Sequence, residues 1–527
     1  EAQGAVSSNI HASVSGMVVG SERRFLPNGT VAACMVIKND GQDTLDPTIT
    51  PRESGLVLPP DEIRQLLAEK GIVGMGGATF PTHVKYAPQS SGRIIDTVIL
   101  NGIECEPFIT ADYRILIEHA DEVIRGLKYF LKASLANKGI IAIEDNKPRA
   151  IELFNQLTAD DPNISVVVCP EKYPQGSERH LIYAVTGRVV PERALPSAVG
   201  VIVDNVATAM QAALAVKDDL PCYERIVTVS GNAVHKPGNY RVRIGTLYSH
   251  LVEQGAQGLK NDPARIISGG PMMGAPMSWE AAMNASVTKT TSGILVLPED
   301  GAIDRRRKTQ LNNMLNRAKA ACIQCTFCTQ LCPRHMLGHP LQPHRIMRKM
   351  AMNMPHQDNN ETAKDHWILP ELLEDKDIRQ AAICSECGVC EVYACPMGLQ
   401  PRVVNSLIKG ELAQAGIRYS REGDTWEADA NRPYRKVPTK RIAARAGVGA
   451  YYHIDGHTYK GETASKVVLP LKMNIGVPAE PVISDGVHVE KGQLIAACPE
   501  GKLGANLHAS ISGTAHLTRN AITITEV

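Results

Sequence analysis

Eight of the thirteen cysteines lie in two short motifs whose spacing suits iron binding. The first motif has three cysteines at two-residue intervals and then a Cys-Pro pair: Cys322, Cys325, Cys328 and Cys332. The second has one extra residue before its Cys-Pro pair: Cys384, Cys387, Cys390 and Cys395. Three thiolates at this spacing wrap one corner of a four-iron cluster, and in two-cluster proteins the fourth cysteine ligates the other cluster. We therefore expect two 4Fe-4S centres, one on Cys322, Cys325, Cys328 and Cys395, the other on Cys384, Cys387, Cys390 and Cys332.

Zinc is the alternative metal for these cysteines. Zinc sites join two Cys-x2-Cys units into a tetrahedral set of four sulfurs, and they do not need a third cysteine followed by Cys-Pro. The pattern therefore favours iron-sulfur clusters. The second motif has four residues between Cys390 and Cys395, whereas the bacterial ferredoxin run has three before its last cysteine. His335, His339 and His344 lie nearby and could hydrogen-bond to cluster sulfur, or could be ordinary surface or core residues.

A second candidate site is the glycine-rich segment over residues 71–85, which contains Gly74, Gly76, Gly77 and Lys85. Glycine lets the backbone approach a phosphate or a flat ring, exposed amides donate to anions, and lysine supplies a cation. Structural turns use the same residues, so this segment alone is weak support for a site. Three polar segments follow it in the chain, at residues 101–107, 173–179 and 203–208.

These four segments, in this order, resemble the flavin- and NADH-binding domain of the NADH-oxidising subunit of respiratory complex I. Nearly the whole chain is similar to the family of Rnf complex C subunits and PduS-like cobalamin reductases. The resemblance implies an oxidoreductase in which FMN accepts hydride from NADH and passes electrons to the clusters, with no side chain as general acid or base. It implies flavin contacts from Gly74, Gly76, Gly77, Lys85, Asn101, Glu104, Asn205 and Thr208, and dinucleotide contacts from Phe80, Glu106, Tyr173, Gly176 and Glu178.

The sequence departs from the complex I pattern at three flavin-site positions. Complex I has arginine where Met75 stands, an acidic residue where Ile103 stands and glutamate where Ser177 stands. A domain that keeps the fold and the clusters but has lost its nucleotide is therefore the alternative.

The two ends of the chain carry related sequences, because residues 9–16 and 506–513 are identical at six of eight positions. Short β-branched runs broken by glycine turns precede the second copy and predict a small all-β sandwich. The first copy lacks them, and half a sandwich would expose unpaired strand edges. We therefore expect about 30–40 residues before Glu1, or another segment that supplies the strands. Lipoyl and biotin carriers have a similar sequence pattern, but residues 509–512 contain no lysine at the position that carriers modify.

Apolar runs at residues 97–100 and 139–143, with helical periodicity between them, predict an α/β layer. We expect a multidomain α/β protein with a partial barrel-sandwich module over residues 1–50, a Rossmann-like FMN and NADH domain over 55–216, a β-grasp (SLBB-like) module over 222–278, a helical ferredoxin-like two-cluster domain over 305–415, a linker over 416–464 and a second barrel-sandwich module over 465–527.

Composition limits the partners. Lys and Arg number 56 against 55 Asp and Glu, a net charge of +1 that does not suggest a nucleic-acid partner. The basic run at residues 305–308 could be a docking patch or a solvated helix face. The most apolar long stretch, residues 198–216, contains polar residues and is too short to span a membrane. Clustered cysteines and the absence of a recognisable signal peptide favour the cytoplasm, with a microcompartment or the inner face of the cell membrane as possible sites.

The electron acceptor has two candidates on the sequence alone. One is a corrinoid carried by a corrinoid enzyme or an adenosyltransferase, and the other is ferredoxin or the membrane subunits of an Rnf-type ion-translocating complex. A non-catalytic electron-transfer adaptor, docked through its barrel-sandwich ends, is the alternative from a different functional class.

Overall fold

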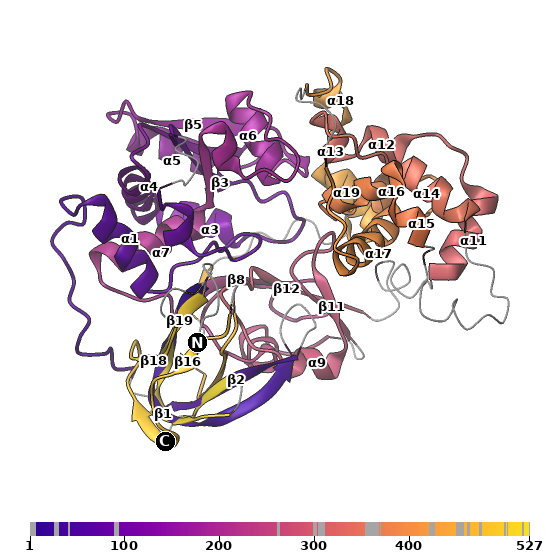
Figure 1. Ribbon diagram of the computed structural model, residues 1–527. Coiled ribbons are helices and arrows are strands. Elements are labelled where there is room, and N and C mark those ends of the chain that lie inside the picture. Colours follow the sequence, from indigo (N-terminus) through magenta and orange to yellow (C-terminus); the bar gives the residue numbers. More distant parts are fainter. Residues whose placement is uncertain are drawn as a thin grey trace.

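The computed structural model describes residues 7–525 apart from 26–30, 40–42, 89–93, 261–263, 299–302, 304–310, 354–367, 369, 421–426, 450–457, 461–463, 474–476, 500–501, 503 and 519–520. Figure 1 shows four structural regions. One is an α/β region, one is built on a β-sheet, one is helical, and one is a barrel-like sheet that joins both ends of the chain. In the described part of the chain, no helix is long and apolar enough to cross a membrane.

The first region is a parallel four-stranded sheet in the order β5-β4-β3-β7, which confirms the predicted α/β layer. Its strands are β3 (Thr97–Gly102), β4 (Lys138–Glu144), β5 (Ile164–Cys169) and β7 (Val201–Asn205). Its helices are α1 (Pro60–Glu69), α2 (Thr82–Lys85), α3 (Ala111–Glu118), α4 (Ala120–Ser134), α5 (Pro148–Leu157), α6 (Glu178–Thr186), α7 (Val206–Lys217) and the 3-10 turn η1 (Pro196–Val199). The helical stretch between the first two strands breaks at His119 into two helices.

Helix α7 is fixed by close packing against α4. A Cβ atom on Gly126 of α4 would overlap the backbone of Ala209 in α7, so only glycine allows this approach. Ten of the twelve residues of α7 are buried, which accounts for its apolar sequence on all sides. The N-terminus of this helix is thereby held at the carboxyl end of β7.

The second region is a six-stranded sheet in the order β11-β10-β12-β8-β9-β14. Its elements are β8 (Glu224–Ser230), β9 (Gly238–Arg243), α8 (Tyr248–His250), the π-helical turn η2 (Leu251–Gly255), β10 (Ala264–Ser268), β11 (Ala275–Met277), α9 (Trp279–Met283), β12 (Gly293–Pro298) and β14 (Thr458–Lys460). Because β12 lies between β10 and β8, this β-grasp module extends beyond the predicted boundary at residue 278.

The two ends of the chain form one module, and the expectation of two separate modules is wrong. Strand β1 (Ser7–Phe25) pairs in parallel with β19 (Gly504–His516), and the sequence repeat is in register, with Asn9 opposite Asn506 and Gly16 opposite Gly513. The remaining strands of this eight-stranded sheet are β2 (Val31–Asn39), β15 (Lys466–Pro470), β16 (Glu480–Pro481), β17 (Val487–Val489), β18 (Leu494–Ala497) and β20 (Ala521–Thr525). The C-terminal segment thus supplies partners for the edges that β1 and β2 would otherwise expose, which confirms the alternative that another segment supplies the strands.

This pairing also bears on the carrier alternative. Ser510 and Ile511 are fully buried in the middle of β19, opposite Ser13 and Val14 of β1. A carrier would present its modified residue at an exposed hairpin tip, whereas these residues lie within a sheet.

The helical region contains both cysteine motifs. Its elements are α11 (Leu311–Ala321), α12 (Phe327–Gln330), α13 (Pro333–Met336), α14 (Pro343–Met352), α15 (Pro370–Leu373), α16 (Lys376–Arg379), the 3-10 turn η4 (Gln380–Ile383), the π-helical turn η5 (Cys390–Ala394) and α17 (Pro401–Gln414). Leu315, Ile346 and Ile408 pack together in its core. Residues 305–308, the basic run noted in the sequence, lie outside the described residues.

The segment predicted as a linker over residues 416–464 is instead structured over much of its described part. It contains α18 (Arg432–Arg435), β13 (Val437–Pro438) and α19 (Thr439–Ala446), and β13 pairs with β6 (Lys172–Tyr173) of the α/β region. Ile442 of α19 is fully buried. The sequence shows no period here because these short pieces complete structure in other regions.

Candidate functional site

The glycine-rich segment and the three polar segments that follow it meet at the carboxyl ends of β3 and β7. Strand β3 has two neighbours in the sheet, β4 on one side and β7 on the other. The chain passes from β3 to β4 and β5 on the first side and later returns to β7 on the second, so the strand order reverses between β3 and β7. Asn101 and Asn205 are directly opposite each other at these strand ends. Ligands of open α/β sheets bind at such a reversal point. The topology therefore places the expected flavin residues where a ligand site is expected.

The glycine-rich loop lies over this point. The amide of Gly74 donates to the carbonyl of Phe80 at 2.8 Å, and Gly76 and Gly77 are exposed. A Cβ on Gly76 would lie 3.0 Å from the side-chain nitrogen of Asn205, so the loop passes directly against β7. Gly77 has a φ of +107° and open space around it. The loop therefore offers bare backbone to a ligand, as a phosphate or a flat ring requires.

The first turn of α7 contacts the glycine-rich loop. Asn205 caps α7 by accepting from the amide of Ala207 at 2.8 Å, and it donates to Asp112 at 2.6 Å. The fully buried hydroxyl of Thr208 accepts from the amide of Met75 at 3.0 Å. The positive end of a helix and the loop amides favour an anion, which matches the phosphate of FMN.

Lys85 has a partner that the sequence reasoning missed. Its ammonium group donates to the carboxylate of Asp204 at 2.8 Å and to the carbonyl of Val203 at 2.9 Å. Tyr86 donates to the other oxygen of Asp204 at 2.8 Å. Asp204 is 2% exposed, so the lysine neutralises a buried charge at the end of β7. The apolar run at residues 201–203 before Asp204 was the available signal, because a carboxylate inside a buried strand requires a cation.

Glu104 carries the clearest indication of a missing polar partner. One oxygen of its carboxylate accepts from the amide of Asp112 at 2.6 Å. The other oxygen is buried and has no hydrogen-bond partner among the described residues. Burial raises the pKa of Glu104 well above its ordinary value, and the neighbouring Asp112 adds to the rise. A buried carboxyl oxygen without a partner fits a bound group with hydroxyl or N–H donors, such as FMN.

The segment around Gly176 closes the opposite side. Asn101 donates from its amide nitrogen to the carbonyl of Gly176 at 2.9 Å, and a Cβ on Gly176 would lie 2.7 Å from the carbonyl oxygen of Ile103. Glu178, the first residue of α6, is exposed, and Phe80 is half-buried. These residues therefore border the same strand ends.

Glu106 and Tyr173 lie deeper, toward the cysteine region. One oxygen of Glu106 accepts from the amides of Met272 and Met273 at 2.7 and 3.2 Å. Burial raises the pKa of Glu106 to about 7 despite these two hydrogen bonds. Tyr173 is 1% exposed, and its hydroxyl donates to the carbonyl of Cys387 at 2.7 Å. The tyrosine thus joins the flavin-type domain to a cysteine motif.

The eight motif cysteines line two cavities in the crossed arrangement. A cavity of about 30 Å³, here called the outer cavity, is lined by Cys322, Cys325, Cys328 and Cys395. A cavity of about 20 Å³, here called the inner cavity, is lined by Cys332, Cys384, Cys387 and Cys390. Each set contains three cysteines of one motif and the last cysteine of the other.

The cysteine loops have the geometry that turns thiols toward a common centre. Thr326, Glu386 and Gly388 have positive φ angles of 62°, 58° and 79°, which fold the chain tightly between successive cysteines. The amide side chain of Gln324 donates to the sulfur of Cys322 at 2.9 Å, and the amide of Leu399 donates to that of Cys395 at 3.3 Å. Donors to sulfur stabilise thiolate ligands and influence cluster potential.

The donor set fits a cluster better than zinc. Among the described residues, no group of three or more His, Cys, Asp or Glu side chains is placed to hold a single metal ion. Four thiols nevertheless surround each cavity. Burial raises the pKa of Cys328 to about 12 and that of Cys387 to about 11. Binding of a cation such as cluster iron would convert these thiols to thiolates.

The three histidines near the motifs have different positions. His335 is half-buried, and its Nδ1 has no hydrogen-bond partner among the described residues. His344 contributes to the lining of the outer cavity, and its Nδ1 is 2.7 Å from the hydroxyl of Thr329. His339 is 1% exposed, and its Nε2 is 3.0 Å from the carbonyl of Val190. His339 is therefore a core residue, whereas His344 is placed to influence the outer centre.

Comparisons with known families match each region of the fold. Residues 67–214 match the Nuo51 FMN-binding domain, residues 226–276 the SLBB domain and residues 321–400 the 4Fe-4S dicluster domain. Residues 1–42 and 456–523 together match the RnfC barrel sandwich hybrid domain, in agreement with the single sheet that joins the two ends. The fold and site thus define an iron-sulfur flavoprotein of the electron-transfer class.

Whole-chain relatives identify the family. Cobalamin reductase PduS of Citrobacter freundii is 38% identical over 463 residues, which cover 88% of this chain and 96% of the relative. The PduS protein of Salmonella typhimurium is 37% identical over 89% of this chain and 97% of its own length. The C subunit of the Na(+)-translocating ferredoxin:NAD(+) oxidoreductase complex of Acetobacterium woodii is 40% identical over 69% of this chain and 77% of its own. The chain belongs to the family that contains PduS cobalamin reductases and Rnf-type C subunits.

Proposed function

We propose that this protein oxidises NADH with bound FMN and passes the electrons through two 4Fe-4S centres to a corrinoid or protein acceptor. The observation that carries the proposal is the direct contact between Tyr173, beside the flavin-type site, and Cys387 of the inner cavity. FMN, when bound, converts a two-electron hydride donor into a source of single electrons. The chain therefore has to hold flavin and clusters in one rigid arrangement.

The proposed flavin contacts divide by chemistry. The loop amides at Gly76 and Gly77 and the N-terminus of α7 would receive the phosphate, since they present donors and positive potential. The unpaired oxygen of Glu104 would accept from a flavin hydroxyl or N–H. Glu106, Tyr173, Gly176 and Glu178, with Phe80, would border the dinucleotide. Lys85 would act through Asp204 by holding the end of β7.

The proposed cluster ligands follow the two cavities. Cys332, Cys384, Cys387 and Cys390 would hold the inner centre, and Cys322, Cys325, Cys328 and Cys395 the outer one. Among the described residues, the hydrogen bond from Tyr173 to Cys387 links the inner set to the flavin-type domain, so electrons would reach the inner centre first. No described side chain is needed as an acid or base for this transfer.

The acceptor and the place of action belong to the proposal. Similarity to PduS over most of the chain favours a corrinoid held by an enzyme or an adenosyltransferase, inside the cell and in a microcompartment. Similarity to C subunits and the barrel-sandwich match favour a second candidate, in which the chain docks on membrane partners and exchanges electrons with ferredoxin. A corrinoid-reduction assay with and without added ferredoxin separates the two.

The experiment that tests the main proposal is an anaerobic NADH titration followed in the visible spectrum. Wild-type protein should lose both flavin and cluster absorbance on adding NADH. Gly76→Glu should lose FMN, because its side chain would overlap Asn205 and repel a phosphate, while keeping clusters that dithionite bleaches. Gly410→Glu is the matched control, since a side chain there meets nothing within 4 Å. If NADH does not reduce the clusters of FMN-loaded wild-type protein, the proposal fails and only the adaptor function remains.

A further inference from the structure

The inner and outer cavities differ in their surroundings. The inner cavity is fastened to the flavin-type domain, since His180 Nε2 lies 2.7 Å from the carbonyl of Pro333, beside Cys332. Arg402, which contributes to the lining of the inner cavity, donates to the carbonyl of Met272 in the β-grasp module at 3.0 Å. Among the described residues, no such contact to the flavin-type domain involves the cysteines of the outer cavity. The outer cavity therefore lies where electrons would leave the protein.

Large apolar side chains surround the outer cavity on the surface. Ile323, Phe327 and Met397 line the cavity or adjoin its cysteines, and they are 63%, 50% and 37% exposed. Ile323 follows Cys322 in a loop, Phe327 begins α12 next to Cys328, and Met397 lies in the turn after Cys395. Exposed apolar side chains gathered at a site mark a surface that another molecule covers.

Two exposed arginines, Arg317 and Arg348, supply positive charge at the rim of the outer cavity. Residues 311–353 contain six Lys and Arg and no Asp or Glu, but Arg334 faces the cysteines of the inner cavity and Arg345 pairs with Asp377. Arg317 donates to the carbonyl of Met397 at 3.1 Å, which places its guanidinium beside the cavity. Arg348 lies one helical turn after His344, a lining residue, on the same face of α14. Lys349 does not add free charge, because Asp375 and Asp377 neutralise it.

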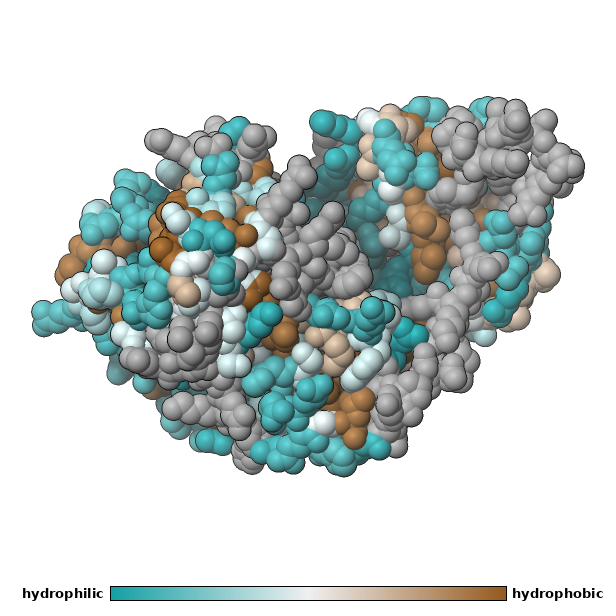
Figure 2. Space-filling model, turned by 90° about the horizontal axis from the view of Figure 1, so that it is seen from below, coloured by the Kyte–Doolittle hydropathy of each residue, from teal (hydrophilic) through white to brown (hydrophobic). Residues whose placement is uncertain are grey.

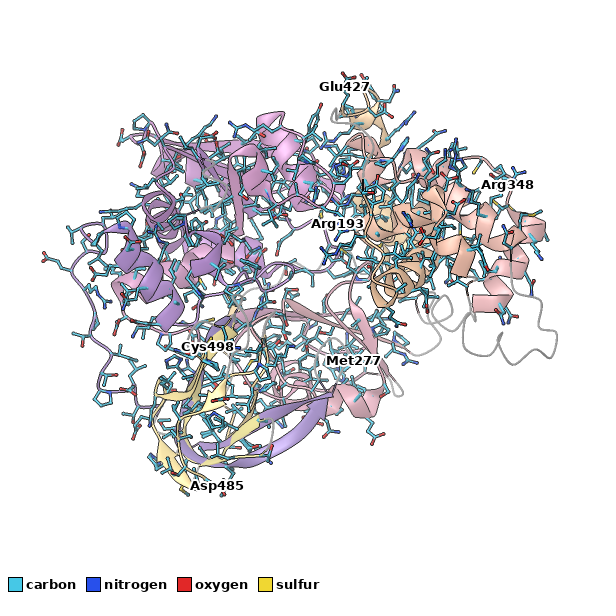
Figure 3. All side chains as sticks on the ribbon, viewed as in Figure 1. Arg193, Met277, Arg348, Glu427, Asp485 and Cys498 are labelled. Carbon is cyan, nitrogen blue, oxygen red and sulfur yellow. The ribbon has the colours of Figure 1, made fainter. Side chains whose placement is uncertain are left out.

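Arg317 and Arg348 have no carboxylate partner among the described residues, and both are exposed. Figure 3 shows Arg348 on the side of the helical region turned away from the flavin-type domain, whereas Arg193 lies between the two. Figure 2 shows the molecule hollowed between these two parts, with hydrophilic residues on the visible wall. Because both arginines are exposed, they are accessible to a protein partner.

We propose that the surface formed by Ile323, Phe327, Met397, Arg317 and Arg348, here called the exit surface, docks the acidic face of a one-electron carrier protein. This inference rests on the proposed function, because the outer set of cysteines must hold a cluster for electrons to leave there. One electron passes from the reduced protein to the oxidised carrier, and no bond forms or breaks. The apolar centre excludes water, while the arginines steer and orient a negatively charged partner.

The test measures binding of two carrier proteins of opposite charge to the anaerobically purified holoprotein by surface plasmon resonance. Flavodoxin is the acidic probe and cytochrome c the basic one. We expect flavodoxin to bind at low salt and to dissociate as salt is raised. The charge-reversed variant Arg317→Glu/Arg348→Glu should bind flavodoxin about tenfold or more weakly and gain affinity for cytochrome c. Lys440→Glu/Arg441→Glu, the same charge change on exposed residues of α19, is the control and should bind like wild type.

A second variant tests the apolar part of the exit surface. Phe327→Ser should weaken flavodoxin binding without changing its salt dependence, because it removes apolar contact and no charge. Cluster absorbance is recorded for each preparation, so loss of the clusters, which counts against the proposed function, is distinguished from failure of docking. The inference is overturned if cluster-loaded wild-type protein does not bind flavodoxin, or if both double variants weaken binding equally.

Discussion

The hydroxyl of Tyr173 donates a 2.7 Å hydrogen bond to the backbone carbonyl of Cys387. The tyrosine belongs to the segment that packs on Asn101 at the flavin-type site, and the cysteine lines the inner cavity. A buried hydrogen bond thus joins the proposed flavin domain directly to a proposed cluster ligand. This contact would help to hold the proposed flavin and inner cluster at a constant distance, on which the rate of electron transfer depends.

Tyr173→Phe removes that hydrogen bond without removing the ring. Because the carbonyl of Cys387 is left unpaired in a buried place, we expect the variant to be less stable by about 1–3 kcal/mol. FMN and iron content should stay unchanged, while cluster reduction by NADH slows. Thermal unfolding and anaerobic stopped-flow absorbance measure the two effects. Tyr434→Phe, at a residue 88% exposed, is the control and should change neither.

The crossed cysteine sets predict which double variants lose one cluster and which lose both. Cys332→Ser with Cys384→Ser changes one cavity, so about four of about eight irons should remain. Cys332→Ser with Cys328→Ser changes both cavities, so both centres should be damaged and iron should fall toward zero. Iron analysis and electron paramagnetic resonance of the reduced proteins check this. The opposite ranking of the two pairs would mean that each motif ligates its own cluster.

Asn205→Ala should weaken the flavin site as well as the fold. The variant loses the cap of α7 and the hydrogen bond to Asp112, at a cost of about 1 kcal/mol for the cap. We also expect faster loss of FMN on dilution, measured by flavin fluorescence. Ser278→Ala removes the equivalent cap from α9, far from the strand ends. It should lose comparable stability and retain FMN, and equal flavin loss in both would point to a general effect of stability.

The raised pKa of Glu106 predicts a pH dependence of stability. Its pKa of about 7 in the folded chain lies above the ordinary value of 4.5, so the folded state holds this proton more tightly than the unfolded state. Stability from this group therefore falls as pH rises from about 4.5 to 7 and is constant above, a change of about 3 kcal/mol at most.

The Glu106→Gln variant cannot ionise at this position, so its stability should fall less over the same range. The burial-raised pKa of Glu144, also about 7, gives a slope of the same sign in both proteins. The measurement is therefore the difference between wild type and variant in denaturant unfolding from pH 5 to 8. Parallel curves would show that Glu106 does not titrate in this range.

The sequence was sufficient for the cysteine sets and for the α/β layer. The Cys-x2-Cys spacing within each motif is a local property, because it reflects how closely a short loop can wrap around a cluster. The apolar runs of β3 and β4 likewise reflect burial on both faces of a parallel sheet. Such features are determined by residues close together in the chain.

What the sequence did not predict depends on contacts between distant segments. The union of β1 with β19 depends on pairing between residues about 500 positions apart, and the pattern of either end alone does not show it. Strand β13 is two residues long and acquires its structure by pairing with β6. The ion pair of Lys85 with Asp204 arises because α2 packs beside the end of β7. In each case the partner, and not the local sequence, determines the outcome.

The cofactor content of anaerobically purified protein tests the central claim most directly. Iron, acid-labile sulfide, zinc and flavin are measured on one sample and related to the protein concentration. The account predicts about eight irons, about eight sulfides and one FMN per chain, in a brown protein whose flavin is bleached by NADH. A colourless protein with two zinc ions and no flavin would contradict it.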